Sequence, residues 1–212
     1  MTFKTVSFKG HEFKIVRGTT HPEYSYDSFE KEEVDIREKY WNVGPGQVVV
    51  DVGASYGSYT LTACAMGAFV HAFEPERTVY ADLVANLELN GWRGRRAIAY
   101  PVGLWDSEGK VNMASYAPHW PKQTISGEYD VVRMDGFGWP EGVDWIKVDV
   151  EGAEGHVLQG ARGTIEKFHP KMLIECHTFL DEWMVNKVKA LLPDGYRFEE
   201  IIRPPCITLY AR

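Results

Sequence analysis

Two short segments carry side chains that can move protons or bind a cation. Asp149 and Glu151 alternate along IKVDVEGAE, and Glu175 and His177 alternate along LIECH. Carboxylates and imidazoles serve as general acids and bases, and carboxylates also bind divalent cations. Glu151 and Glu154 have a second explanation, because acids at the start of a helix are stabilised by its dipole without any catalytic role. Asp149 and His177 are therefore the first candidates for proton transfer.

The segment VVVDVGASYG, residues 48–57, suits a ligand with a nucleotide-like part. Gly53 permits a tight turn after a strand, and Gly57 permits the N-terminus of the next helix to approach a ligand closely. Glu74 follows the next apolar run, 23 positions after Asp51, where nucleotide-binding βαβ units carry the acid that binds ribose hydroxyls. A plain strand–turn–helix corner would explain the glycines but not this acid. The predicted ligand site comprises Asp51, Gly53, Ala54, Ser55, Gly57 and Glu74.

The residues of this turn favour S-adenosylmethionine over a dinucleotide. Dinucleotide sites prefer three glycines, so that a pyrophosphate can pack against the turn, whereas this turn carries Ala54, Ser55 and Tyr56. The carboxylate of Asp51 would repel phosphate but suits the ammonium group of the methionine portion. We expect the adenine to contact residues after the third strand of the sheet, namely Val102, Gly103 and Leu104.

The sequence pattern predicts the elements that would position these residues. Strand-like and helical patterns alternate after residue 45, which is typical of parallel α/β proteins. In such sheets, ligands bind at the carboxyl ends of the strands. The last two apolar runs are joined too tightly for a crossover helix, so they must be antiparallel neighbours. Strands are predicted at 48–52, 68–73, 97–102, 145–150, 172–176, 196–201 and 206–210, and helices at 56–66, 78–90, 154–168 and 181–192.

The first 45 residues have a different pattern. Two alternating segments joined at Lys9 and Gly10 predict a hairpin, and the acidic stretch 29–41 predicts a helix. We expect residues 1–45 to form an appendage and residues 46–212 to form the main domain. Between the third and fourth strands the pattern is irregular, and there Tyr116, His119 and Trp120 suit either a substrate lid or an exposed loop.

Composition is typical of one globular domain, since 44% of the 212 residues are hydrophobic and 25% are charged. A net charge of −7 disfavours a broad nucleic-acid surface. The three cysteines are far apart and form no CxxC motif, so a reducing cytoplasm is expected rather than a disulfide framework. No segment resembles a signal peptide or approaches the ~20 apolar residues of a transmembrane helix. We therefore expect a cytoplasmic protein without a membrane or nucleic-acid partner.

Several of these segments together resemble the FkbM family of methyltransferases. The resemblance covers about residues 45–180 and implies a Class I, Rossmann-like α/β fold. Such a fold has a seven-stranded, mostly parallel sheet in the order 3-2-1-4-5-7-6, with the last strand antiparallel and helices on both faces. The matching segments are DVGASYG at 51–57, FEPE at 73–76, YADLVANLELNG at 80–91, IKVDVEGAE at 146–154 and LIECH at 173–177.

The resemblance also implies an activity, the transfer of a methyl group from S-adenosylmethionine to a hydroxyl of a small molecule or sugar-containing metabolite. Asp149 and His177 are then the candidates for the general base, with Glu151 and Glu175 beside them and Asp149 also near the cofactor. Some methyltransferases of this fold instead bind magnesium with acids at these strand ends. Asp149 and Glu175 would supply part of such a site, but no third ligand occupies a diagnostic position.

Alternative functions remain open on the sequence alone. An RNA ribose 2′-O-methyltransferase would need catalytic lysines and a basic channel. The side chain of Lys147 is expected to be one position out of phase with the strand residues that flank Asp149, and the only basic cluster in the sequence is residues 93–96. A non-enzymatic nucleotide-binding scaffold would not need the acids Asp51, Glu74, Asp149 and Glu175. A nicotinamide oxidoreductase is disfavoured by the chemistry of the glycine turn.

Overall fold

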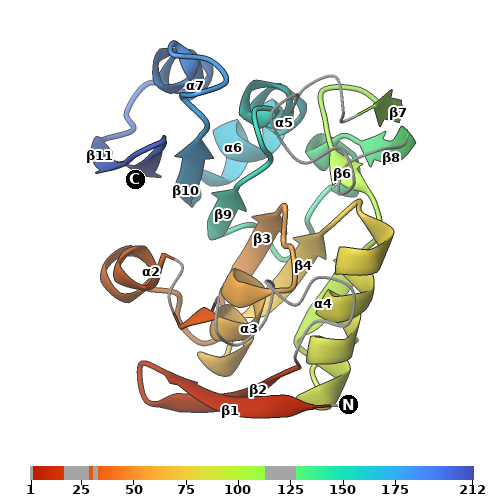
Figure 1. The fold of residues 1–212 in the computed structure, drawn as a ribbon. Helices are drawn as coiled ribbons and strands as arrows, with labels where there is room; N and C mark the ends of the chain where they lie inside the picture. Colours follow the sequence, from red (N-terminus) through yellow and green to blue (C-terminus); the bar gives the residue numbers. More distant parts are fainter. Residues whose placement is uncertain (1, 17–28, 31–32, 113–127) are drawn as a thin grey trace. The chain divides into compact units, whose positions relative to one another are not determined.

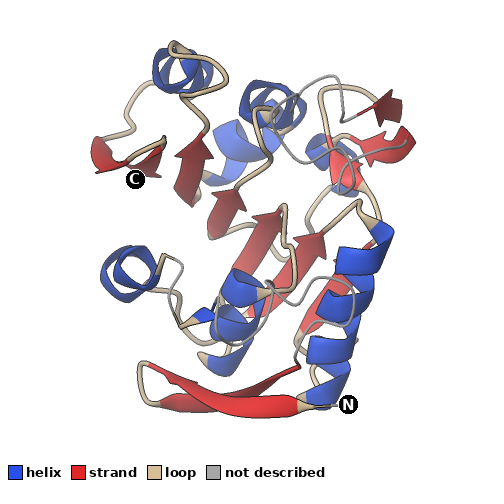
Figure 2. Cartoon of the chain, in the orientation of Figure 1, coloured by secondary structure: helices blue, strands red, loops and turns tan. Residues whose placement is uncertain are grey.

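The structure is a computed structural model that describes residues 2–16, 29–30, 33–112 and 128–212. The chain forms two compact units, Met1–Pro101 and Val102–Arg212, each with strands and helices packed together (Figures 1 and 2). Tyr116, His119 and Trp120, with their suggested lid, lie outside the described residues. In the described ranges, every helix is too short or too polar to span a lipid bilayer. The boundary expected after residue 45 stays a prediction.

The first unit contains a parallel sheet of three strands in the order β5-β4-β3. Strand β3 (Val48–Val52) pairs with β4 (Phe69–Phe73), which pairs with β5 (Ala97–Tyr100). All residues of β3 are buried, as its β-branched composition predicts. Helix α3 (Ser58–Ala65) connects β3 to β4, and α4 (Arg77–Leu89) connects β4 to β5. The third strand ends earlier than predicted, because the proline that follows cannot donate to the ladder.

The predicted N-terminal hairpin is confirmed. Strands β1 (Phe3–Phe8) and β2 (His11–Val16) are antiparallel, and Lys9 and Gly10 form the turn with φ of 47° and 81°. The hairpin packs with β2 against α3 and α4, and Figure 1 shows it running along the end of this unit. Helix α2 (Val34–Tyr40) covers part of the helix predicted at 29–41.

Four strands of the second unit lie side by side in the order β9-β10-β12-β11. Strands β9 (Trp145–Val148) and β10 (Lys171–Cys176) are parallel, whereas β12 (Cys206–Ala211) is antiparallel to both β10 and β11 (Phe198–Arg203). The predicted antiparallel closing pair is therefore confirmed, and helix α7 (Met184–Leu191) precedes it. The orders in the two units agree with the halves 3-2-1 and 4-5-7-6, and the complete order stays a prediction.

A single helix predicted at 154–168 is instead two helices, α5 (Glu154–Gly160) and α6 (Arg162–Phe168). A Cβ atom at Gly160 would lie 1.8 Å from the carbonyl oxygen of Trp105, so the end of α5 touches backbone. The Asp135 carboxylate accepts hydrogen bonds from the N–H groups of Gly163 and Thr164, at 3.1 and 2.8 Å, and so caps α6. Contacts from distant residues thus divide the helix.

Asp135 follows a small sheet of the second unit. Its strands are β6 (Gly103–Leu104), β7 (Gly109–Asn112) and β8 (Glu128–Val132), in the order β6-β8-β7, and Asp135 itself lies in the 3-10 helix η2 (Met134–Phe137). This sheet lies in the region between the third and fourth predicted strands, where the sequence pattern is irregular. It also places the chain around Trp105 against α5.

Gly160→Ala should destabilise the protein by about 2–3 kcal/mol, because a methyl group would collide with backbone rather than with a flexible side chain. The measurement is the free energy of unfolding in urea. Gly155→Ala is the matched control in the same helix, since a Cβ there would meet Leu191 Cδ1 at an ordinary 3.9 Å. A loss of stability at both glycines, or at neither, would contradict the close approach of Trp105 to α5.

Candidate functional site

The turn that follows β3 has an unusual backbone. Gly53, Ser55 and Gly57 have φ of 73°, 51° and 104°, in the left-handed region that glycine adopts most easily. The N–H groups of Gly53 and Ala54 both donate to the carbonyl of Phe73, at 3.0 and 2.9 Å. These bonds fix the turn to the carboxyl end of the neighbouring strand β4.

Glu74 and Asp51, the acids expected to bind the ligand, both lie at the carboxyl ends of their strands. The Glu74 carboxylate accepts the N–H of Ser55 and the N–H of Glu76, each at 2.9 Å, and the residue is 8% exposed. Asp51 is fully buried and accepts the hydroxyl of Thr60 at 2.6 Å. Each acid therefore also braces the turn or helix beside it, and its role toward a ligand stays a prediction.

Gly57 is tightly enclosed on the side of α4, and its predicted role toward a ligand stays a prediction. A Cβ atom at this position would lie 2.8 Å from Cδ1 of Leu83 on α4. A side chain at this position would therefore have to displace the end of the Leu83 side chain and adopt a positive φ.

The residues predicted to contact adenine fall in the other unit. Val102 precedes β6, in which Gly103 pairs with Val131 and Leu104 with Val132. Their contact with adenine stays a prediction. Trp105, which follows them, is buried and stacks on His156 with ring centroids 4.2 Å apart, so core packing explains it.

An acid–histidine cluster, formed by Asp149, Glu151, Glu154 and His177, lies in the second unit where β9 and β10 end. Nδ1 of His177 lies 2.5 Å from Oε1 of Glu154. On the other side of the ring, Nε2 lies 3.0 Å from Oε2 of Glu151 and 3.7 Å from Oδ1 of Asp149. The structure therefore brings together three of the four predicted catalytic residues and adds Glu154.

Burial and charge act on the His177 ring in opposite directions. Its burial disfavours the charged form, but hydrogen bonds to Glu151 and Glu154 and the charge of Asp149 outweigh that effect and raise the pKa of His177 to about 11. With both ring nitrogens facing carboxylates, the imidazolium form satisfies both sides. At neutral pH the ring therefore carries a proton and has no lone pair with which to accept another.

Two residues of this environment were given no catalytic role from the sequence, and for Lys147 the expectation that its phase sets it apart from the acids is wrong. Lys147 is buried, and its Nζ lies 3.4 Å from Oδ2 of Asp149. The alternation of strand residues could have identified it, because residues two apart lie on the same face. Glu154 is fully buried, and its Oε1 also accepts the N–H of Gly152 at 3.1 Å. The sequence suggested only a helix-dipole role for it.

Two groups of side chains around His177 bring together atoms that could bind a cation, and one of them includes Glu175. Glu175 has an oxygen within 4.8 Å of ligand atoms of His177 and Cys206, and Asp149 and Glu151 form a similar group with His177. His177 offers a nitrogen and Cys206 a sulfur, and burial with the nearby Glu175 charge raises the pKa of the Cys206 thiol. These donor sets therefore fit magnesium, which prefers six oxygens, poorly. The pair Asp149 and Glu175 stays a prediction.

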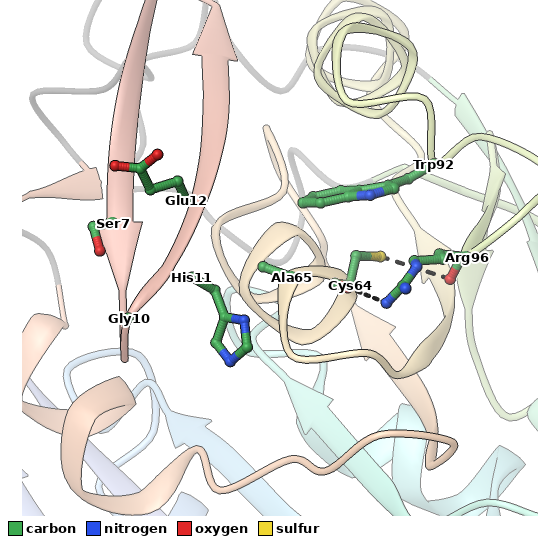
Figure 3. Close-up of a pocket in the computed structure, with 8 residues that line it drawn as sticks. All are labelled: Ser7, Gly10, His11, Glu12, Cys64, Ala65, Trp92 and Arg96. Atoms are coloured by element: carbon green, nitrogen blue, oxygen red, sulfur yellow. Dashed lines mark hydrogen bonds between the residues drawn. The ribbon is translucent and has the colours of Figure 1, made fainter.

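A cavity of about 530 Å³ in the first unit lies at the hairpin and the end of α3 (Figure 3). Figure 3 shows Trp92 and Arg96 on one side and residues of the hairpin on the other. The Arg96 guanidinium donates to the carbonyl of Cys64 at 2.9 Å, near the C-terminus of α3. Arg96, from the basic cluster noted in the sequence, thus stabilises a helix end. The eight residues that line the cavity are Ser7, Gly10, His11, Glu12, Cys64, Ala65, Trp92 and Arg96.

Comparison with known families and structures adds an independent observation. The model of the methyltransferase FkbM domain matches residues 51–203, a range that contains both the glycine turn and the acid–histidine cluster. A comparison with curated proteins gave no match. The matched range is more than half of the chain.

Solved structures show the same kind of fold. Methyltransferase FkbM from Methylobacillus flagellatus KT is 22% identical with a TM-score of 0.63, covering 83% of this chain and 46% of that one. Fibrillarin from Aeropyrum pernix, solved with S-adenosyl-L-methionine, is 14% identical with a TM-score of 0.53, and the match covers 99% of this chain and 82% of that one. The tRNA (uracil-54, C5)-methyltransferase from Pyrococcus abyssi, in complex with S-adenosyl-L-homocysteine, is 15% identical with a TM-score of 0.54, covering 100% and 44%.

This chain spans less than half the length of the first and third of these proteins. The likeness confirms the Rossmann-like fold predicted from the sequence.

Proposed function

The chain belongs to the FkbM methyltransferase family, and from this membership we propose that it transfers the methyl group of S-adenosylmethionine to a hydroxyl of a small molecule or sugar-containing metabolite. The acid–histidine cluster is the observation that carries the proposal. It offers a partly exposed carboxylate, Asp149, beside a buried and fixed imidazolium, His177, at the carboxyl ends of parallel strands. Methyl transfer to a hydroxyl requires such a group to accept the hydroxyl proton.

The first unit fits the cofactor. Glu74 lies at the end of β4, where a carboxylate can accept hydrogen bonds from ribose hydroxyls, and Asp51 suits an ammonium group. Gly57 gives the turn a positive φ at a position where a Cβ atom would collide with Leu83. The cofactor, when bound, supplies a methyl group on a sulfonium. We propose that Gly53, Ala54 and Ser55 provide the backbone against which it binds.

Gly57→Ala should weaken binding of S-adenosylmethionine by about tenfold or more, because its Cβ would meet Leu83 and its φ of 104° strains an alanine. Isothermal titration calorimetry measures the dissociation constant. Gly46→Ala is the control, since Gly46 has φ of 79° but nothing within 4 Å of a Cβ, which isolates backbone strain from close approach. Equal affinities for the two variants would contradict the enclosed turn.

The second unit supplies the proton acceptor in this proposal. His177 is already protonated at neutral pH, so we assign the general base to Asp149. The imidazolium of His177 and the ammonium of Lys147 both lie beside the Asp149 carboxylate and hold it in place. Glu151, which faces Nε2, helps to orient the ring. Glu175, the remaining predicted catalytic residue, has no step assigned to it.

A second candidate function, ribose 2′-O-methylation of RNA, is favoured by one observation. Lys147 forms an ion pair with Asp149, and a lysine beside the acid is what that activity requires. The net charge of −7 argues against a broad RNA-binding surface. The two candidate functions differ in the acceptor of the methyl group, which is a metabolite hydroxyl in the first and an RNA ribose in the second.

Transfer of labelled methyl from S-adenosylmethionine distinguishes these functions. Purified protein is incubated separately with an RNA-free metabolite extract and with total RNA, and the labelled products are identified by mass spectrometry. Label on a hydroxyl of a metabolite supports the proposal, and label on RNA ribose supports the second candidate. Binding of NAD instead of S-adenosylmethionine, or of neither, would overturn both.

A further inference from the structure

One peptide group of the glycine turn is held at both ends. The N–H of Gly57 donates to the carbonyl of Ala54 at 2.9 Å, and the carbonyl of Tyr56 accepts Nδ2 of Asn86 at 2.9 Å. Asn86 lies on α4 and is 1% exposed. The orientation of the Tyr56–Gly57 peptide therefore depends on a side chain from another element.

The other end of the Asn86 amide is also bonded. Its Oδ1 accepts the N–H of Val16, the last residue of β2, at 2.7 Å. Because one partner is an N–H and the other a carbonyl, only one orientation of the amide satisfies both. Asn86 thus links the N-terminal hairpin to the glycine turn through one rigid group.

This link acts where the turn is most easily rearranged. Gly57 has a positive φ and no Cβ, so its preceding peptide can rotate at low steric cost. Without Nδ2 of Asn86, the buried carbonyl of Tyr56 would lose this hydrogen-bond donor, which favours rotation of the peptide toward another donor or water. The N–H and carbonyl positions along the turn would then change.

We propose that Asn86 is a positioning residue for cofactor binding, which fixes the Tyr56–Gly57 peptide and is itself held by the hairpin. The inference rests on the proposed function, because it takes S-adenosylmethionine as the ligand of this turn. It gives the hairpin, expected from the sequence to be an appendage, a role in the affinity of the cofactor site.

The chain contains a matched control one helical turn further along α4. Oδ1 of Asn90 accepts the N–H of Lys14 at 2.8 Å, and its Nδ2 donates to the carbonyl of Lys14 at 2.7 Å. Asn90 therefore binds the same strand of the hairpin, and within the described residues its side-chain hydrogen bonds go to Lys14 and to the carbonyl of Asn86 rather than to the glycine turn. A comparison of the two asparagines separates fixing the turn from anchoring the hairpin.

The test measures binding of S-adenosylmethionine and S-adenosylhomocysteine by calorimetry in the full chain and three variants. Asn86→Ala removes both bonds, whereas Asn86→Asp keeps an acceptor for Val16 but loses the donor to Tyr56. Asn90→Ala loses only bonds to the hairpin and the helix. Far-UV circular dichroism and thermal unfolding establish a temperature at which each variant is folded, and Asn86→Asp carries the test if Asn86→Ala does not fold.

Both Asn86 variants should bind the two compounds at least about tenfold more weakly than the wild type. The affinity of Asn90→Ala should stay within about threefold of the wild-type affinity. Wild-type affinity in the Asn86 variants, or an equal loss in Asn90→Ala, would overturn the inference while leaving the proposed function intact. Failure of the wild-type chain to bind either compound would instead overturn the proposed function, and this inference with it.

Discussion

Asp149→Asn should lower the rate of methyl transfer by about 10²–10⁴-fold, the usual contribution of a general base. Asparagine has the size of aspartate but accepts no proton at neutral pH, so the hydroxyl would have to lose its proton without help. The affinity for S-adenosylmethionine should change by less than about tenfold, because the variant leaves unchanged the residues proposed to bind the cofactor, namely the glycine turn, Asp51 and Glu74.

Single-turnover kinetics with labelled S-adenosylmethionine, together with calorimetry, separate these two effects. Asp130→Asn is the charge-matched control, because Asp130 is an exposed acid of the same unit that pairs with Lys110 at 3.2 Å. Its rate should equal that of the wild type. A full rate in Asp149→Asn would remove Asp149 from the mechanism, and a loss of cofactor binding without a change in the chemical step would make it a binding residue.

His177→Gln should destabilise the protein by about 3–5 kcal/mol at pH 6, as expected when one member of a buried ion pair is removed. Glu154 is fully buried, and its carboxylate would lose the imidazolium that lies 2.5 Å from its Oε1. The free energy of unfolding in urea measures the loss. His156→Gln is the matched control, because His156 also pairs with an acid, Asp106, but its side chain is 37% exposed, and exposed pairs contribute little.

The loss of stability in His177→Gln should depend on pH. The pKa of His177 is about 11 in the folded protein, against 6.5 for an ordinary histidine. The folded state therefore binds this proton more tightly than the unfolded chain does, and the stability it contributes is complete below pH 6.5 and lost as pH rises toward 11. The difference between wild type and His177→Gln should shrink over that range, and a difference independent of pH would refute the charged imidazole.

Much of the fold follows from local sequence, because its strands satisfy simple rules. The β-branched run of β3 predicts a buried strand, and Lys9 and Gly10 predict the tight hairpin turn. The division of α5 from α6 was not predictable in the same way. It depends on Trp105 and Asp135, which are distant in sequence from Gly160 and reach the helices only in the folded protein.

The candidate site, like the fold, could be predicted from the sequence only in part. The positions of Asp149 and His177 at strand ends follow from the parallel topology, so their proximity was predicted correctly. The protonation of His177 was not, because it depends on Glu154, whose side chain turns inward from the start of a helix. Sequence identifies which residues meet, but burial and the full set of neighbours determine which of them can accept a proton.

The contact between Gly160 and Trp105 also has a consequence for comparing relatives. Because a methyl group at residue 160 would overlap the Trp105 carbonyl, any relative with a larger residue there must have a displaced segment after its third strand. Glycine at this position thus serves as a marker that sorts homologous chains by the path of that segment. Chains without it should be aligned there by structure rather than by residue type.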